Sequence, residues 1–172
     1  MSLTEDRRAL HRIPELDREV PETIAYLKSR LEGLNCSVFS PMTGALCAWF
    51  DFGAKKAIAF RAETDALPIC ESSAKDYASV HPGKMHACGH DGHMAILLEL
   101  ARRLSGKEKL PHNMLLVFQP AEETTGGAKQ LCATGIFRRY QVQAIFGLHL
   151  WPQLPEGMIA SRCNEMMARS CE

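Results

Sequence analysis

One short segment, HACGHDGH at residues 86–93, concentrates side chains that can bind a metal or transfer a proton. Cys88 and His90 stand two residues apart across a glycine, which allows both side chains to turn towards one point. A thiolate suits zinc, and a neutral imidazole suits zinc, nickel or manganese. The same pattern is equally compatible with a helix start that contains a buried free thiol. His86 and His93 are weaker candidates, because His93 falls in the first turn of an expected helix.

A second candidate group is the pair Glu122-Glu123, which is followed by two glycines. Adjacent residues point in different directions, so the two carboxylates cannot easily do the same job. One can bind a metal while the other faces a water molecule at the substrate. The competing interpretation is a solvated acidic helix start, which the helix dipole favours and which is the commoner situation for such a pair taken alone.

Two further side chains could complete a metal site. His149 follows the apolar run IFGL, where a lone histidine is more often a hydrogen-bonded core residue than a ligand. Asp65 could hold a histidine in orientation from outside the coordination sphere, as metal sites usually require, or it could cap the turn into Leu67 and Pro68. Asp91, directly after the cysteine and histidine pair, is assigned the same orienting role as Asp65.

Periodicity and breakers predict which elements position these groups. Thr4 is expected to cap the first helix, and Pro14 to stop it. Strands alternate with helices, and two strands are continuously apolar, which indicates an α/β domain with a mostly parallel, mixed sheet and helices on both faces. The helices are expected at 4–11, 19–34, 91–105 and 126–134, and the strands at 36–40, 45–52, 56–63, 112–120, 142–150 and 157–162.

The candidate residues follow the predicted strands in a regular way. Asp65 comes after strand 56–63, the two glutamates come after strand 112–120, and His149 lies at the end of strand 142–150. Because ligands bind at the carboxyl ends of strands in such sheets, we expect these side chains to meet at one edge, where the 86–93 segment also opens a helix.

Composition excludes several classes of protein. Lys and Arg together number 20, as do Asp and Glu, so no basic surface recommends a nucleic-acid partner. No apolar run approaches the roughly 18 residues of a membrane span, and the first residues do not resemble a signal peptide. The seven cysteines are an odd number without a Cys-x-x-Cys pair, which argues against a disulfide framework or a zinc ribbon and favours the reducing cytoplasm.

Four segments together resemble the amidohydrolase branch of the M20 metallopeptidase family: FRAETDALPI, PGKMHACGHDGHMAILL, VFQPAEETTGGAKQL and IFGLHLWPQLPEGMIA. That branch includes hippurate, auxin-conjugate, aminobenzoyl-glutamate and N-acetyldiaminopimelate hydrolases. The resemblance covers nearly the whole chain and implies a zinc-peptidase-like fold that is incomplete. Residues 1–172 would be the N-terminal part of the catalytic domain. The lid or dimerisation domain and the C-terminal catalytic segment, with its further metal-binding histidine, would be absent.

The resemblance also implies a two-metal centre and a reaction. Cys88 would bridge the ions, the terminal ligands would be His90, Glu123 and His149, and the general base would be Glu122. The ions would be zinc or manganese in the first place, with nickel or cobalt as further options. The activity implied is hydrolysis of the amide bond of an N-acyl amino acid by a water molecule held between the metals. His86 and His93 gain no role, and Glu63 departs from the aspartate that most members have there.

A non-catalytic role is the alternative interpretation. Four side chains, one of them bridging, are few for two metals, so a chain limited to these residues would hold metal weakly and could fold without turnover. We also expect a cut sheet edge or an exposed apolar face, which would favour a homodimer or instability. A redox role for Cys88 is disfavoured, because no resolving cysteine lies nearby in the sequence.

Overall fold

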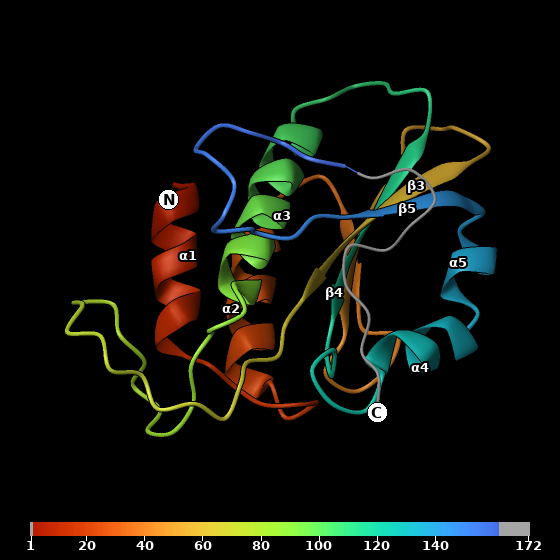
Figure 1. Ribbon diagram of the computed structural model, residues 1–172. Helices are drawn as coiled ribbons and strands as arrows, with labels where there is room; N and C mark the ends of the chain where they lie inside the picture. The colour runs from red at the N-terminus through yellow and green to blue at the C-terminus, as the bar shows by residue number, and fades with distance from the viewer. Residues whose placement is uncertain (1, 162–172) are drawn as a thin grey trace.

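A five-stranded mixed sheet forms the centre of the protein in a computed structural model, which describes residues 2–161 (Figure 1). The order of the strands across the sheet is β1-β2-β4-β3-β5. β3 pairs in parallel with both β4 and β5, whereas β2 pairs antiparallel with β1 and β4. The expected α/β class is confirmed, and the parallel strands make up the half of the sheet that carries the candidate site. The strands are β1 (Ser37–Phe39), β2 (Leu46–Phe50), β3 (Ala57–Glu63), β4 (Asn113–Gln119) and β5 (Val142–Gly147).

Helices cover both faces of this sheet (Figure 1). Leu27, Leu98 and Leu116 belong to the core on one face, beneath α1, α2 and α3. Leu115 and Leu131 belong to the smaller core on the other face, beneath α4 and α5. Among the described helices, none is both long and apolar enough to cross a bilayer. The helices are α1 (Leu3–Arg12), α2 (Pro21–Leu31), α3 (His90–Ser105), α4 (Gly127–Ala133) and α5 (Ile136–Arg139).

The register of the parallel strands explains why distant segments meet. Glu63 at the end of β3 lies opposite Gln119 at the end of β4, and Gly147 at the end of β5 lies opposite Arg61. The three strands therefore stop nearly level with one another. The loops that follow them leave from the same edge of the sheet, beside the first turn of α3.

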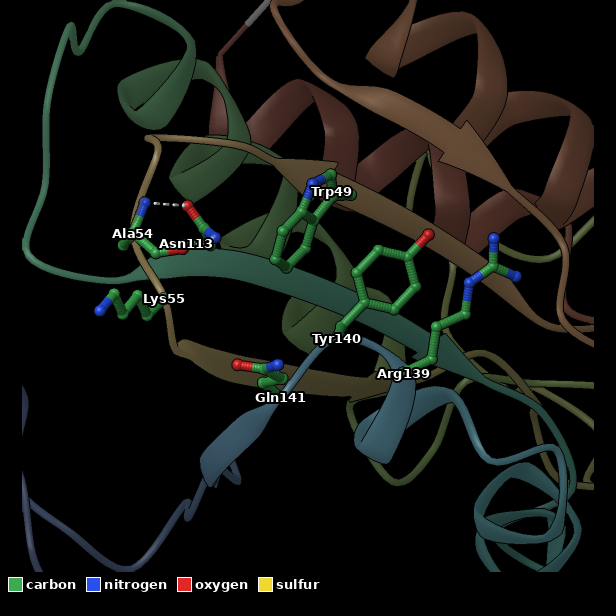
Figure 2. Close-up of a pocket in the computed structure, with 7 residues that line it drawn as sticks. All are labelled: Trp49, Ala54, Lys55, Asn113, Arg139, Tyr140 and Gln141. Carbon is green, nitrogen blue, oxygen red and sulfur yellow. Dashed lines mark hydrogen bonds between the residues drawn. The ribbon is translucent and has the colours of Figure 1, made fainter.

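The opposite end of the parallel strands carries a shallow depression (Figure 2). Asn113, which lines the depression, has a structural role. Its amide oxygen accepts hydrogen bonds from the backbone N–H groups of Phe52 and Ala54, at 2.8 and 3.2 Å. Trp49 and Tyr140 lie against each other with their ring centroids 4.5 Å apart. Within residues 2–161, no thiol, imidazole or carboxylate side chain lines the depression, so these residues offer no usual metal ligands there.

The start of the first helix differs from the prediction. α1 begins at Leu3 and is capped by Ser2, not by Thr4. The Ser2 hydroxyl accepts a hydrogen bond from the backbone N–H of Glu5, and the Glu5 carboxylate accepts one from the backbone N–H of Ser2. This reciprocal arrangement requires an acid three residues after the cap. Thr4 could not form it, because the residue three positions further on is Arg7.

Other boundaries also differ. The helix expected at 19–34 ends at Leu31, because Glu32 is extended and Gly33 takes a positive φ of 77°. β5 stops at Gly147 rather than at 150, where its pairing with β3 ends. The strand expected at 157–162 is wrong for residues 157–161, which form no strand, and residue 162 lies outside the described residues. The short helix α5 was not expected from the sequence.

Candidate metal centre

Three of the predicted ligands lie together at the sheet edge. Cys88 precedes α3, His90 is the first residue of that helix, and His149 follows β5. The Cys88 Sγ lies 3.3 Å from the His149 Nε2. Ligand atoms of all three residues lie within 4.8 Å of one another, which is close enough for one cation to touch them. Gly89, between the first two, takes a left-handed conformation with φ 95°, which other residues rarely adopt.

His90 is held in the orientation that a metal ligand needs. Its side chain is buried, and its Nδ1 lies 2.7 Å from the backbone carbonyl oxygen of Asp65. Because a carbonyl oxygen only accepts, Nδ1 carries a proton, and the tautomer that binds a metal has its lone pair on Nε2. That Nε2 lies 3.7 Å from the Glu123 Oε1 and 3.9 Å from the Glu122 Oε2. The lone pair therefore faces both glutamates.

His149 is oriented in the same way. Its Nδ1 donates to the backbone carbonyl oxygen of Leu150 at 2.7 Å, which leaves the Nε2 lone pair facing Cys88. Histidine ligands of metals commonly have their second nitrogen fixed by a carbonyl or carboxylate. Both candidate imidazoles thus share one arrangement: Nδ1 is fixed to a backbone carbonyl and Nε2 points at the other ligands.

The two glutamates are placed differently from each other. The backbone N–H of Glu123 donates to the Asp65 Oδ2 at 3.0 Å, and the Glu123 Oε1 is buried without a hydrogen-bond partner in the described part of the chain. The Glu122 side chain is 41% exposed and forms no hydrogen bond among the described residues. Glu123 therefore faces inward with an unsatisfied oxygen, and Glu122 stands free at the rim.

Asp65 connects these ligands. Its backbone carbonyl holds His90, its Oδ2 holds the backbone of Glu123, and its own Oδ1 is buried without a hydrogen-bond partner among residues 2–161, with the His90 Nδ1 4.0 Å away. A buried carboxylate oxygen that lacks a partner is costly unless a cation or a proton is nearby. Together with the Cys88 thiol, the Nε2 atoms of His90 and His149 and the unsatisfied Glu123 oxygen, this donor set fits a divalent cation.

The electrostatics of the cluster also favour a cation. Burial and the neighbouring carboxylates of Glu123, Glu122 and Glu63 raise the pKa of Cys88 to about 12. Burial, and then the charge of Glu123, raise the pKa of Glu122 above its usual value. A divalent cation would reverse the local preference, because it stabilises thiolate and carboxylate together.

A second set of hydrogen bonds, which the sequence did not predict, holds the backbone next to His149. The His93 Nδ1 contacts the Glu63 Oε2 at 2.8 Å, and its Nε2 accepts a hydrogen bond from the backbone N–H of Leu150 at 3.0 Å. Burial works against the charge on Glu63, but His93 and Arg61 outweigh it and lower the pKa to about 2. The rings of His93 and His149 also pack edge to face, with centroids 4.7 Å apart. The signal in the sequence was His93 three residues after His90, on the same side of the helix.

Close packing holds the chain at Leu150 against the start of α3. A Cβ atom added to Gly92 would lie 2.5 Å from the Leu150 Cδ1, and one added to Gly89 would lie 3.4 Å from that atom. The absence of side chains at these two positions therefore creates the space that Leu150 occupies. The backbone next to His149 is thus held by the hydrogen bond from Leu150 to His93 and by the packing of the Leu150 side chain.

The remaining predicted residues lie elsewhere. Asp91 is buried, and its Oδ2 contacts the His11 Nδ1 at 2.7 Å and the Arg7 Nε at 2.8 Å, so its hydrogen bonds join α1 to α3 and hold no candidate ligand. At the second position of the helix its side chain points about 100° away from His90. His86 is buried, has no partner for either ring nitrogen among the described residues, and has a pKa lowered to about 4 by burial.

The fold and these donors define an α/β protein with a candidate site for divalent cations at the carboxyl ends of its parallel strands. The model of Peptidase family M20/M25/M40 matches residues 59–165, which is more than half of the chain. The protein belongs to this family. The matched region contains every residue of the donor cluster.

Two relatives give the extent of the similarity. An uncharacterized hydrolase of Staphylococcus epidermidis is 42% identical over 99% of this chain, which spans 45% of the relative's length. The Bacillus subtilis YXEP protein, described as a dinuclear metal binding peptidase from the M20 family, is 36% identical with a TM-score of 0.83. That comparison covers 89% of this chain and 43% of the YXEP chain. The protein therefore corresponds to slightly less than half of these relatives.

Proposed function

We propose that this protein carries the N-terminal part of the catalytic site of a metal-dependent amidohydrolase that cleaves N-acyl amino acids. The observation that carries the proposal is the division between the two adjacent glutamates. Glu123 faces the imidazole of His90 with an unsatisfied oxygen, while Glu122 stands free beside the same cluster. Hydrolysis at a metal centre needs this combination of a ligand and an uncommitted base.

The metal site would be formed by Cys88, His90, Glu123 and His149. The dinuclear description of the YXEP relative supports two ions, and the thiol in the donor set favours zinc, with manganese next. Divalent ions in this site would supply Lewis acidity, which lowers the pKa of a water molecule and polarises an amide carbonyl.

Glu122 would perform the proton transfers. Its pKa is raised by burial and by Glu123, which brings the carboxylate closer to the range in which a base both accepts and returns a proton. It would take a proton from the attacking water and deliver it to the nitrogen of the departing amino acid. The fixed orientation of His90 and His149 keeps the surrounding donors in place during these transfers.

The cysteines support a reducing compartment such as the cytoplasm for this chemistry. Cys36, Cys47, Cys70, Cys88 and Cys132 are all free. A ligand thiol must escape oxidation to bind a metal, and a reducing compartment provides that protection.

The test is hydrolysis of N-acetyl and N-benzoyl amino acids with added zinc or manganese, comparing the wild-type protein with Glu122→Gln. We expect the variant to lose roughly 10²–10⁴-fold in rate, because the base is removed while the ligands remain. Metal content by elemental analysis should be the same in both proteins. Glu99→Gln, which alters a partly exposed carboxylate on α3 that is paired with Arg103, is the matched control and should keep the wild-type rate.

A non-catalytic fragment is the second candidate, and one observation favours it. β5 is an edge strand whose apolar residues Ile145 and Phe146 are about half exposed, as expected if further chain normally covers them. In that case the protein would bind metal without turnover. A wild-type rate no higher than that of Glu122→Gln, at equal metal content, would establish this second function and end the first.

A further inference from the structure

A shallow, open cavity of about 450 Å³ lies beside the candidate metal cluster, and Cys88 forms part of its wall. Met85, Leu150 and Trp151 contribute apolar surface to it. Its volume falls within the range of pockets that hold small organic ligands, which are mostly apolar and carry a few placed polar groups. A group bound here would lie against Cys88, one of the proposed metal ligands.

One polar side chain in this wall lacks a partner. His86 lines the cavity, is 3% exposed, and neither of its ring nitrogens has a hydrogen-bond partner in the described part of the chain. Buried imidazoles are normally hydrogen-bonded, as the Nδ1 atoms of His90 and His93 are. His86 therefore offers one donor and one acceptor that nothing in the described fold uses.

The charges around the cavity are already paired. Arg7 forms an ion pair with Asp91, and His11 lies between Asp91 and Glu71, at 2.7 and 3.3 Å. Arg7 and His11 thus both face carboxylates, so the cavity wall has no unpaired basic side chain for an anionic group among the described residues. The polar end of the cavity suits an uncharged group that can donate and accept hydrogen bonds.

We propose that this cavity holds the acyl group of the substrate, and that His86 selects acyl groups with an apolar body and one uncharged hydrogen-bonding substituent, such as a hydroxyl. This deepens the proposed function and rests on it for the identity of the substrate as an acyl compound. A hydroxybenzoyl group combines both features. Its ring would lie against Trp151 and Leu150, and its hydroxyl would satisfy His86.

Binding can be measured without turnover. The sequence contains two tryptophans, so a Trp49→Phe substitution leaves Trp151, in the cavity wall, as the sole reporter. In a zinc-loaded Trp49→Phe, Glu122→Gln background, hydroxybenzoyl-glycine should change the Trp151 emission and bind roughly 3–10-fold more tightly than benzoyl-glycine. That ratio corresponds to one added hydrogen bond. Carboxybenzoyl-glycine should bind more weakly than either.

A variant series then assigns the preference to His86. His86→Leu should remove the advantage of the hydroxyl and leave benzoyl-glycine affinity within about twofold, whereas His86→Gln, which keeps a donor and an acceptor, should retain part of it. His112→Leu, before β4 at the other end of the sheet, is the control and should keep the full ratio. Metal content is measured for each variant, because His86 is close in sequence to Cys88.

Three results would overturn the inference. They are equal binding of hydroxybenzoyl- and benzoyl-glycine to the protein with His86 intact, tighter binding of the carboxylate, and no change in Trp151 emission with any of the three compounds. None of them depends on hydrolysis. Failure of the cavity proposal is therefore separate from failure of the proposed reaction, which the rate of the wild-type protein decides.

Discussion

Glu63 is a buried carboxylate that acts on the candidate ligand His149 without touching it. It fixes His93, which in turn holds the backbone beside His149. We expect Glu63→Ala to weaken zinc binding roughly 10–100-fold, the usual cost of losing an outer hydrogen-bonding partner of a ligand. Glu63→Gln, which can still accept a hydrogen bond, should lose less. Competition with a chromophoric chelator measures both, and equal affinities for Ala and wild type would show that His149 is held by packing alone.

Much of the candidate site could be predicted from residue types and spacing. Cys88, His90 and the two glutamates were visible because each follows a predicted strand or lies at the start of a helix. The structure brings the ligand atoms of His90 together with those of Cys88 and His149 in one group and with those of the two glutamates in another. The link between Glu63 and His93 could not be predicted in this way. It depends on a contact between residues 30 positions apart, and no local pattern encodes the direction of a buried side chain.

Among the elements, the start of α4 determines where the two glutamates stand. A Cβ atom added to Gly127 would lie 1.9 Å from the backbone oxygen of Pro120, which cannot move aside as a side chain can. We expect Gly127→Ala to cost more than about 2 kcal/mol of unfolding free energy and to lower metal affinity, because the loop before α4 must shift.

Gly126→Ala is the matched control, since its Cβ would meet nothing within 4 Å. Its positive φ of 69° should cost only about 1 kcal/mol. Similar losses in chemical denaturation of the two variants would contradict this account.

The three helices on one face are joined by a buried ion network around Asp6. Burial pushes the pKa of Asp6 upwards, but hydrogen bonds from Tyr26, Arg102 and Arg30 outweigh it and hold the pKa below its usual value. A carboxyl with a depressed pKa stabilises the fold above its unfolded pKa of about 3.8 and loses that contribution as the pH falls through the lower folded value. Asp6→Asn should therefore cost on the order of 3 kcal/mol at neutral pH. It should also flatten the decline of stability below about pH 4.

Thermal unfolding at several pH values checks the Asp6 prediction. Glu99→Gln provides the comparison, because Glu99 pairs with Arg102 and Arg103 at the surface of the same helix. Its loss should change stability little. If the Asp6 variant unfolds with the same pH dependence as wild type, the network does not stabilise the packing of α1 and α2 on α3.

The elements themselves were largely predictable, and their ends were not. Hydrophobic periodicity located the four longer helices and the five strands of the sheet within a few residues. The segment 157–161 has the apolar residues of a strand but no neighbouring strand to pair with in the described chain, so pattern alone was misleading there. Strand pairing is a property of the whole sheet, and the sequence of one segment does not contain it.

At the scale of the whole molecule, the sheet ends at β5, an edge strand without the usual protection against pairing with other chains. β5 has one pairing partner, β3, and its other edge is free among the described residues. Phe146 is 52% exposed, and Ile145 is 47% exposed. Natural edge strands usually carry charges, prolines or bulges that prevent pairing with other chains, and the exposed part of β5 has no charged residue. An unpaired edge of this kind can pair with a strand of another chain or of a second copy.

We therefore expect the protein alone to self-associate through β5, with the sedimentation coefficient rising over the micromolar concentration range. Phe146→Lys places a charge on the free edge and should shift the protein towards the monomer, because burying that charge between two copies costs more than the pairing gains. Val38→Lys, on the opposite edge strand β1, is the matched control, since Val38 is also exposed at 38%. Its sedimentation should remain that of wild type. If Val38→Lys dissociates the protein and Phe146→Lys does not, association occurs at the β1 edge, and the exposed apolar surface of β5 has another cause.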